Sequence, residues 1–390
     1  MGTASGGGEA ARPPSSTAVF AVWAIAIALF FVGAAVLLTP HERAAYWLRD
    51  LPVYVDALKT FAAGSDPYRA ALVPRARGLF FTGPPFVWAL YRWVAESQLR
   101  RFVAPTLIAA GFISSALIPL LQSWLFLGRR AERIALGCAF FFTAFAGAGF
   151  FAAMATNNGT PLYALIVAAL APAVRRDRWI FFHAAVALAT AFKPFYAAFW
   201  LLPLLSNGAF TRHLMGAAVG MGAAALSYLA PLLAAPALFH EWLQALSKQT
   251  LVDGLLGTNL FAAVFHQTSA QGHRLAPYEA QLAFSAALLA ASLVLPRERT
   301  QRIAGLTLAA VFLNPRLMPY DLCVAAIPLL ACLAGAASAT SQAVWAVLLT
   351  VLMIACDRSS PGLDGFLYPA LVMLGLLVAI VIPRLRPARA

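Results

Sequence analysis

Residues 19–38 read VFAVWAIAIALFFVGAAVLL, an apolar stretch without a charged residue. A helix needs about 20 apolar residues to cross the hydrocarbon core of a membrane. Stretches of this kind recur along the 390-residue chain, of which 62% is hydrophobic and 11% is charged, with a mean hydropathy of +0.78. Soluble domains carry about 25% charged residues. The composition therefore excludes a water-soluble globular protein and predicts an integral membrane protein.

The apolar stretches predict an all-α, polytopic transmembrane protein of about twelve helices. Residues 1–18 have the composition of a disordered cytoplasmic tail, 19–383 form one membrane domain, and 384–390 form a basic cytoplasmic tail. No small-residue cleavage site follows the first stretch, so we expect it to be a retained helix rather than a signal peptide. The predicted spans are 19–38, 102–127, 134–153, 160–174, 179–192, 193–205, 214–236, 277–295, 303–314, 322–336, 342–356 and 366–383.

Arginines in the short connections predict the orientation. Cytoplasmic connections of membrane proteins carry an excess of Lys and Arg. The pattern predicts cytoplasmic termini in a bacterial-type plasma (inner) membrane, and most of the acidic residues then fall on the outer side, which indicates an outward-facing polar site. The net charge is +13, from 28 Lys+Arg and 15 Asp+Glu. We interpret these basic residues as setting the orientation in the membrane and attracting acidic lipid headgroups, and not as a nucleic-acid-binding surface. The arginines in alternate connections are Arg129, Arg130, Arg133, Arg175, Arg176, Arg178, Arg212, Arg297, Arg299, Arg302, Arg384, Arg386 and Arg389.

The first outer loop, residues 40–101, is the most informative segment. Its apolar residues Val53, Leu58 and Phe61 have helical spacing and predict an amphipathic helix on the membrane surface. A second apolar segment follows at 86–94. We interpret it as another interfacial helix, because a span here would invert every later connection.

Motifs in this loop give a family resemblance. Asp-x-x-x-Tyr (Asp50 and Tyr54) follows the first apolar stretch, then Gly-x-Asp-Pro-Tyr ends at Tyr68, and aromatic-x-x-Pro-Pro occupies 81–85. The pattern resembles glycosyltransferase family 87, membrane enzymes of the GT-C superfamily related to polyprenol-phosphate-mannose-dependent mannosyltransferases. Weaker matches follow in order at Asn157-Asn158-Gly159-Thr160, Phe192-Lys193-Pro194, Asn314-Pro315-Arg316 and Tyr320-Asp321.

The resemblance implies transfer of a sugar, mannose or another hexose or pentose, from a polyprenyl phosphate. It also implies a lipid-anchored or periplasmic glycan acceptor on the outer face and inversion of the anomeric centre. The acceptor hydroxyl must lose a proton as it attacks, so a carboxylate is the expected general base. The resemblance assigns this role to Asp50. The alternative for Asp50 is a helix N-cap, with Pro52 in the first turn.

A lipid phosphate leaving group needs a fixed cation. Lys193 interrupts a long apolar stretch, and an intramembrane lysine is a functional candidate because burying its charge is costly. The alternative is a lysine that extends to the interface at the break made by Pro194. Arg316, in the last large outer loop, is the second candidate for the donor phosphate.

Further polar residues are expected to line the substrate pocket. The alternative for Asp56 is an ion pair with Lys59, and the asparagines are also typical of caps and turns. Family members often carry a histidine near the last motif, which this chain lacks. A second long outer segment, 238–277, is a possible lid. The predicted pocket residues are Tyr54, Asp56, Tyr68, Asn157, Asn158, Asn259, Tyr320 and Asp321.

No metal-ligand cluster, glycine-rich phosphate loop or nucleotide-binding domain is recognisable, so we expect no metal and no cofactor. The expected partners are the lipid-linked donor, the acceptor and membrane lipids, and the expected state is a monomer. A secondary transporter or lipid flippase is the alternative, since short Pro-broken helices are typical of transporters. Transporters of this size usually have two related halves. The long acidic loop has no counterpart in the second half of the chain, which disfavours the transporter alternative. A silent membrane scaffold would leave the outer acids and Lys193 unexplained.

Overall fold

The computed structural model describes residues 16–38, 51–66, 68, 81–146, 159–206, 209–256, 260–268, 272, 275–295, 299–315, 317–334, 338–357 and 363–385. Within these ranges every regular element is a helix and none is a strand, in agreement with the all-α prediction. The first half contains α1 Ser16–Leu38, α2 Leu51–Ala62, the 3-10 helix η2 Pro85–Val87, α3 Trp88–Glu96, α4 Arg100–Gln122, the π-helical η3 Ser123–Leu127, α5 Ala131–Ala146, α7 Gly159–Arg176 and α8 Trp179–Phe192. The second half contains η4 Pro194–Trp200, α9 Leu201–Ser206, α10 Phe210–Ala234, α11 Pro236–Leu256, α12 Leu260–Thr268, α13 Ala276–Val294, α14 Arg299–Phe312, η6 Pro319–Val324, α15 Ala326–Ala334, α16 Ala339–Asp357 and α17 Asp364–Leu385.

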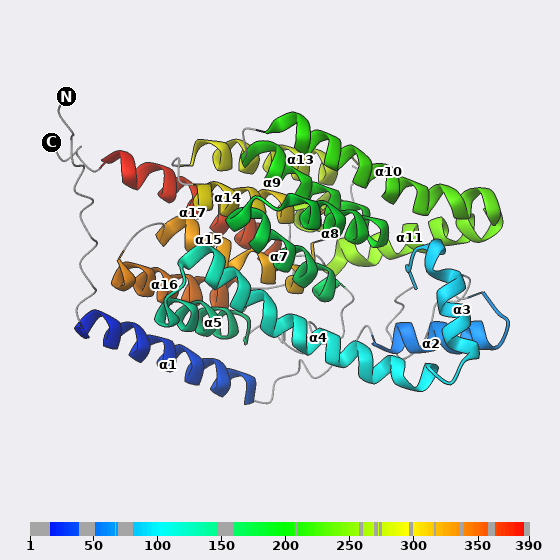
Figure 1. Ribbon diagram of the computed structural model, residues 1–390, viewed down its shortest axis with the longest axis horizontal. Helices are drawn as coiled ribbons and strands as arrows, with labels where there is room; N and C mark the ends of the chain where they lie inside the picture. Colours follow the sequence, from blue (N-terminus) through cyan, green and yellow to red (C-terminus); the bar gives the residue numbers. More distant parts are fainter. Residues whose placement is uncertain are drawn as a thin grey trace, which may run out of the picture.

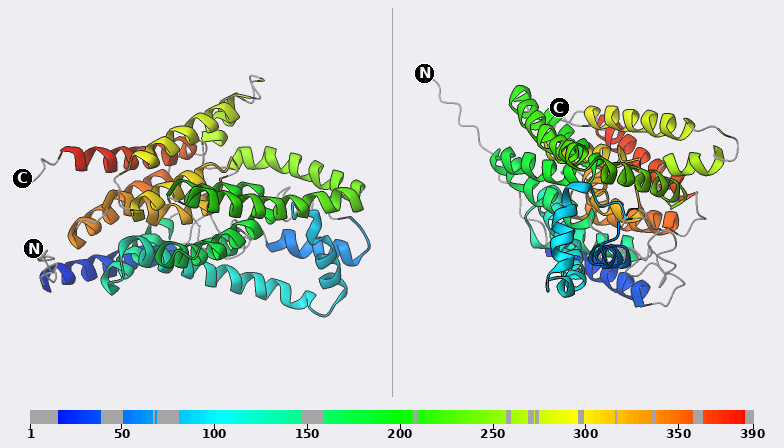
Figure 2. Two further views of the ribbon diagram at one scale, coloured as in Figure 1. Left: turned by 45° about the horizontal axis from the view of Figure 1, so that its top comes forward. Right: turned by 90° about the vertical axis from the view of Figure 1, so that its right-hand side faces the viewer.

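The long helices run side by side along one axis (Figure 1). Helix α1 begins and α17 ends at one end of this bundle, whereas α2, α3 and the junction of α10 with α11 lie at the other end. Helix α3 crosses the direction of the long helices, and α2 runs roughly along it (Figure 2). The two helices predicted in the first outer loop therefore occupy one end of the bundle.

Three helical segments of the described chain are long and apolar enough to cross a membrane: Arg100–Leu127, Phe210–Ala234 and Ala339–Cys356. Shorter apolar helices accompany them at Thr17–Leu29, Trp179–Phe192, Pro194–Ser206, Asp321–Ala334 and Gly365–Val381. Helix α10 exposes large apolar side chains such as Val219 and Leu233, as a lipid-facing helix does. The described chain is thus all-helical, with several helices apolar enough to span a membrane, while the count of twelve spans is not established by these lengths.

The break at Lys193 and Pro194 is where the sequence predicts it. Helix α8 ends at Phe192, and Lys193 adopts an extended conformation with φ −145° and ψ 111°. Pro194 then begins the 3-10 helix η4. Proline has no backbone N–H to continue the hydrogen bonding of α8, but it is well tolerated in the first turn of a new helix. The apolar stretch is therefore divided into two short pieces.

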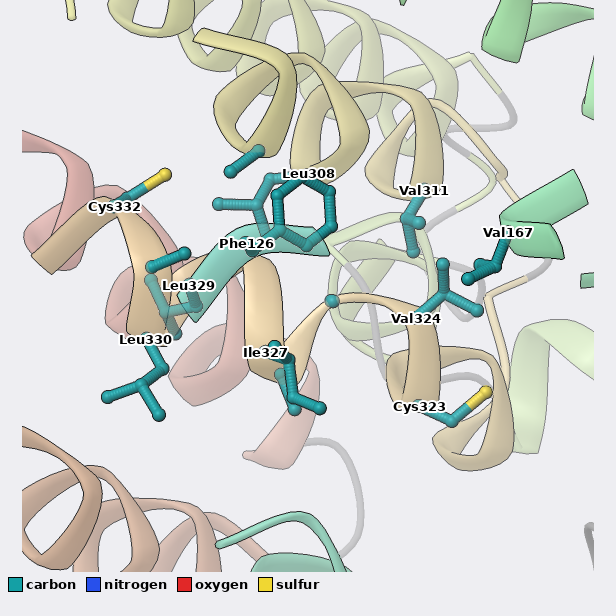
Figure 3. Packing of buried hydrophobic residues seen from close by; sticks show 14 of the residues in the cluster. Phe126, Val167, Leu308, Val311, Cys323, Val324, Ile327, Leu329, Leu330 and Cys332 are labelled. Carbon is teal, nitrogen blue, oxygen red and sulfur yellow. The ribbon is translucent and has the colours of Figure 1, made fainter. Parts of the chain in front are cut away.

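The core lies along α14 and α15, whose side chains are buried on nearly every face. Figure 3 shows Leu308 of α14 and Ile327 of α15 together with Phe126 of η3. Cys323 and Cys332 belong to the same cluster, where they pack as small hydrophobic residues. This packed centre holds the short η6 segment that carries Asp321.

Candidate active site

A second, smaller core joins α2, α3, residues 81–87 and the first half of α11, which we call the α2–α3 assembly. Phe81, only 1% exposed, lies at its centre. Its ring contacts Tyr91 and Tyr68 at centroid distances of 5.2 and 5.5 Å, and Tyr54 and Phe61 at 6.4 Å. The assembly is therefore fixed by aromatic packing from four separate parts of the chain.

Helix α2 is the amphipathic helix that the sequence predicts. However, its apolar face packs against protein and not against a membrane surface as predicted. Val53, Leu58 and Phe61 are buried within the protein rather than against a membrane surface. Trp242 of α11 completes this cover, and its indole Nε1 donates a hydrogen bond to the carbonyl of Thr82 at 3.2 Å. The segment predicted as a possible lid, 238–277, thus contributes through α11 a fixed wall of the same assembly.

Tyr68 has a structural role in this assembly. Its buried hydroxyl donates a hydrogen bond of 2.6 Å to the Gly83 carbonyl, and its backbone N–H donates to the Asp66 carboxylate at 2.8 Å. Burial raises the pKa of Tyr68 far above its usual range, so the hydroxyl remains protonated. A Cβ on Gly83 would stand 2.5 Å from the Phe81 ring, so only glycine fits there.

Asp56 forms the predicted local pair with Lys59. The Lys59 ammonium lies 3.1 Å from the Asp56 carboxylate, one helical turn away on α2. The Lys59 side chain is 73% exposed and that of Asp56 is 27% exposed. Such a solvated pair contributes at most about 1 kcal/mol. Asp56 is not a member of the aromatic core.

The bundle brings Tyr54 and Asp321 towards one residue, Tyr196, and we call these three residues the Tyr196 cluster. Tyr196 of η4 is fully buried and donates a hydrogen bond of 3.1 Å to the carbonyl of Gly159 at the start of α7. Its ring packs edge-on against Tyr163 at 4.8 Å. The Asp321 carboxylate and the Tyr54 hydroxyl both lie within electrostatic range of the Tyr196 hydroxyl. The cluster thereby connects the first loop, the broken segment and η6.

Asp321 is 3% exposed and lies in η6, at the start of the apolar segment Asp321–Ala334. Its carboxylate accepts a hydrogen bond of 3.0 Å from the backbone N–H of Met318 and so holds the start of η6. Gln122 of α4 donates to the Val324 carbonyl at 2.9 Å at the other end of η6. Irregular backbone at membrane depth requires such internal partners. A buried acid in this position is a functional candidate because the membrane environment disfavours its charge.

Lys193 is half-buried at the junction of α8 and η4, close in sequence to Tyr196. The Tyr196 N–H donates to the Lys193 carbonyl at 3.1 Å. The Lys193 ammonium lies 6.0 Å from the centroid of the Phe195 ring, within cation–π range. The lysine is therefore part of the same short connection that carries the buried tyrosine.

Several predicted site residues lie outside the described residues. They are Asp50, Asn157, Asn158, Asn259 and Arg316, and for Tyr320 the structure describes the backbone within η6. Asp50 directly precedes α2, and Asn158 directly precedes α7. Their roles stay predictions.

Tyr196 and Gln122 are the site residues that the sequence did not suggest. A signal for each exists in retrospect. Tyr196 follows Pro194 at the break of an apolar stretch, and Gln122 is a polar residue near the end of a long apolar span. Neither signal shows the partner, because the Val324 carbonyl lies 202 positions away from Gln122.

Within the described part of the chain no group of three or more His, Cys, Asp or Glu side chains is arranged to hold a metal ion. Comparison with protein-family models, curated proteins and solved structures finds no match. The resemblance to glycosyltransferase family 87 therefore rests on the motifs themselves.

Proposed function

We propose that the protein is a membrane glycosyltransferase that moves a sugar from a polyprenyl-phosphate donor to a lipid-anchored or periplasmic glycan acceptor. The observation that carries the proposal is the Tyr196 cluster. Two observations support it: Tyr54 of α2, the helix that follows Asp50, and the buried Asp321 lie within electrostatic range of Tyr196, and Tyr196 lies three residues after the break at Lys193. Members of three motifs that are far apart in the sequence therefore lie near one buried tyrosine, as a shared site would require.

In the proposed reaction Asp50 is the general base. It takes the proton of the acceptor hydroxyl as the acceptor oxygen bonds to the anomeric carbon, and the bond from that carbon to the phosphate oxygen breaks. Polyprenyl phosphate leaves with the bonding electron pair. Lys193 and Arg316 stabilise the charge that accumulates on the phosphate. Attack from the face opposite the leaving phosphate inverts the anomeric centre. The reaction needs no metal or cofactor in this proposal.

The GT-C-type architecture of about twelve spans, the plasma (inner) membrane location and the cytoplasmic termini belong to the same proposal. The basic connections at Arg129 and Arg299 then face the cytoplasm, and the α2–α3 assembly faces outward. Alkaline phosphatase and green fluorescent protein fused after residue 129 and after residue 235 test this orientation. We expect fluorescence from the first site and phosphatase activity from the second, and the reverse pattern would contradict an outward-facing site.

A secondary transporter or lipid flippase is the second candidate, favoured by the Pro-broken segment and by the presence of a buried acid. Proteoliposomes that contain polyprenyl phosphate carrying radiolabelled mannose, together with an acceptor lipid extract, distinguish the two functions. A glycosyltransferase converts the label into a new glycolipid. A flippase exposes the unchanged donor on the opposite leaflet, and that result without any new glycolipid would overturn the proposal.

Lys193→Met is expected to weaken productive binding of the donor about tenfold or more, because it removes a half-buried charge assigned to the phosphate. The measurement is the KM for the donor. The matched control is Lys59→Met, which removes an exposed lysine of α2. Equal KM values for Lys193→Met and wild type would transfer the phosphate role to Arg316 or to backbone donors.

A further inference from the structure

A second polar feature lies where α4 and η3 end, far along the bundle from the α2–α3 assembly (Figure 1). The last carbonyls of a helix have no partner within the helix and attract cations. Here Arg175 donates a hydrogen bond from Nη2 to the Trp124 carbonyl, and Arg133 donates from Nη1 to the Leu127 carbonyl at 3.1 Å. Both arginines are thus held in fixed positions against the end of η3.

Two guanidinium groups meet at one indole ring. The central carbon of Arg175 lies 3.6 Å from the centroid of the Trp124 ring, and that of Arg129 lies 5.8 Å from the same centroid. Gly128, with φ +127°, ends η3 in a conformation that favours glycine and places Arg129 directly after the helix. Two positive charges are therefore held near one another rather than spread over the surface.

The charge of this group is not balanced by acids in the described part of the chain. Arg212 and Arg299 lie within 3.9 and 3.4 Å of the Asp177 carboxylate. By contrast, the described ranges contain no such ion pair for Arg129 or Arg175, and Glu132, the acid nearest in sequence, forms none either. The Nε of Arg175 and that of Arg133 are buried and lack a hydrogen-bond acceptor among the described residues. An anion bound at the two guanidinium groups would supply the missing negative charge.

The position of the group identifies the source of the anion. The segment Arg100–Leu127 is one of the helices long enough to cross a membrane, and Trp124 lies in its last turn. Tryptophan at the end of a span lies at the level of the lipid headgroups. Guanidinium groups bind phosphate through paired hydrogen bonds.

We infer that Trp124, Arg129 and Arg175 form a binding site for the phosphate of an anionic phospholipid headgroup, at the end of the span formed by α4 and η3. Arg175 is the fixed half of the site, because its hydrogen bond to the Trp124 carbonyl and its contact with the Trp124 ring set its position. The exposed Arg129 is the second half and closes on the phosphate from the following connection. This inference is independent of the glycosyltransferase proposal.

Native mass spectrometry of the full-length protein in detergent tests the site, with phosphatidylglycerol and phosphatidylcholine of equal chain length as probes. We expect the wild type to retain the first phosphatidylglycerol at least about fivefold more tightly than phosphatidylcholine. Arg129→Gln is expected to lower the affinity for phosphatidylglycerol about fivefold. Arg130→Gln is the matched control, since it removes the same charge from the next residue, which makes no contact with Trp124 in the described structure. It is expected to change the affinity less than about twofold.

Three results would overturn the inference. An equal loss of affinity for phosphatidylglycerol in Arg129→Gln and Arg130→Gln would show a diffuse attraction to all the basic residues of this face instead of a site. Equal retention of the two lipids by the wild type would show that the headgroup charge is not recognised. Displacement of phosphatidylglycerol by a large excess of inorganic phosphate would show a site for a free anion instead of a lipid.

Discussion

Replacing Asp50 by asparagine is expected to lower the rate of sugar transfer at least about a hundredfold. The substitution keeps the size of the side chain and removes the group that accepts the proton of the acceptor hydroxyl, and general-base catalysis contributes about 10²–10⁴-fold. The measurement is kcat at saturating donor and acceptor. The KM for the donor is expected to change little, because the base acts on the acceptor.

Glu96→Gln is the matched control for this experiment. Glu96 lies on α3 of the same assembly and forms an exposed pair with Arg92 at 2.8 Å, so its loss is expected to change kcat less than about twofold. If Asp50→Asn retains more than a tenth of the wild-type rate, Asp50 is not the base. Asp321 is then the next candidate, and Asp321→Asn tests it in the same assay.

Replacing Phe81 by alanine is expected to destabilise the α2–α3 assembly by about 3–5 kcal/mol, the usual cost of removing a buried phenylalanine. The Phe81 ring contacts Tyr54, Tyr68 and Tyr91, so the loss leaves a cavity that backbone movement cannot readily fill. Amide hydrogen exchange measures the effect. In α2 and α3 the exchange rate is expected to rise at least about a hundredfold, while α14 and α15 stay protected.

The control is Leu90→Ala, which shortens a side chain of α3 that is 57% exposed. We expect this variant to change the free energy of opening by about 0.5 kcal/mol or less. Wild-type exchange rates in Phe81→Ala would contradict the view that this aromatic cluster holds the first loop in place. Since Tyr54 belongs both to this cluster and to the Tyr196 cluster, Phe81→Ala is also expected to lower transfer activity.

The sequence predicts the helices well because hydrophobicity and helix punctuation are local properties. The ends predicted for the stretch before Lys193 agree with α8, and the pairing of Asp56 with Lys59 is present as expected. Each of these features depends on residues that lie within a few positions of one another.

The features that the sequence did not predict depend on contacts between distant segments. Hydrophobic spacing shows that α2 has an apolar face. It does not show whether lipid or protein packs against that face, because both favour the same apolar residues. Only the fold shows that Trp242 covers it. The Tyr196 cluster is similar, since Tyr54 and Asp321 were candidates for separate reasons and their common neighbour was not evident.

The most direct test of the central claim is the product stoichiometry of the purified wild-type protein in nanodiscs, supplied with polyprenyl-phosphate mannose and a membrane-lipid acceptor extract. Thin-layer chromatography and mass spectrometry quantify the polyprenyl phosphate released and the sugar gained by the acceptor. The account predicts that the two products appear together in equal amounts, with the anomeric centre inverted. If neither product forms with mannose or with any other polyprenyl-phosphate sugar, the protein is not a lipid-linked-sugar glycosyltransferase.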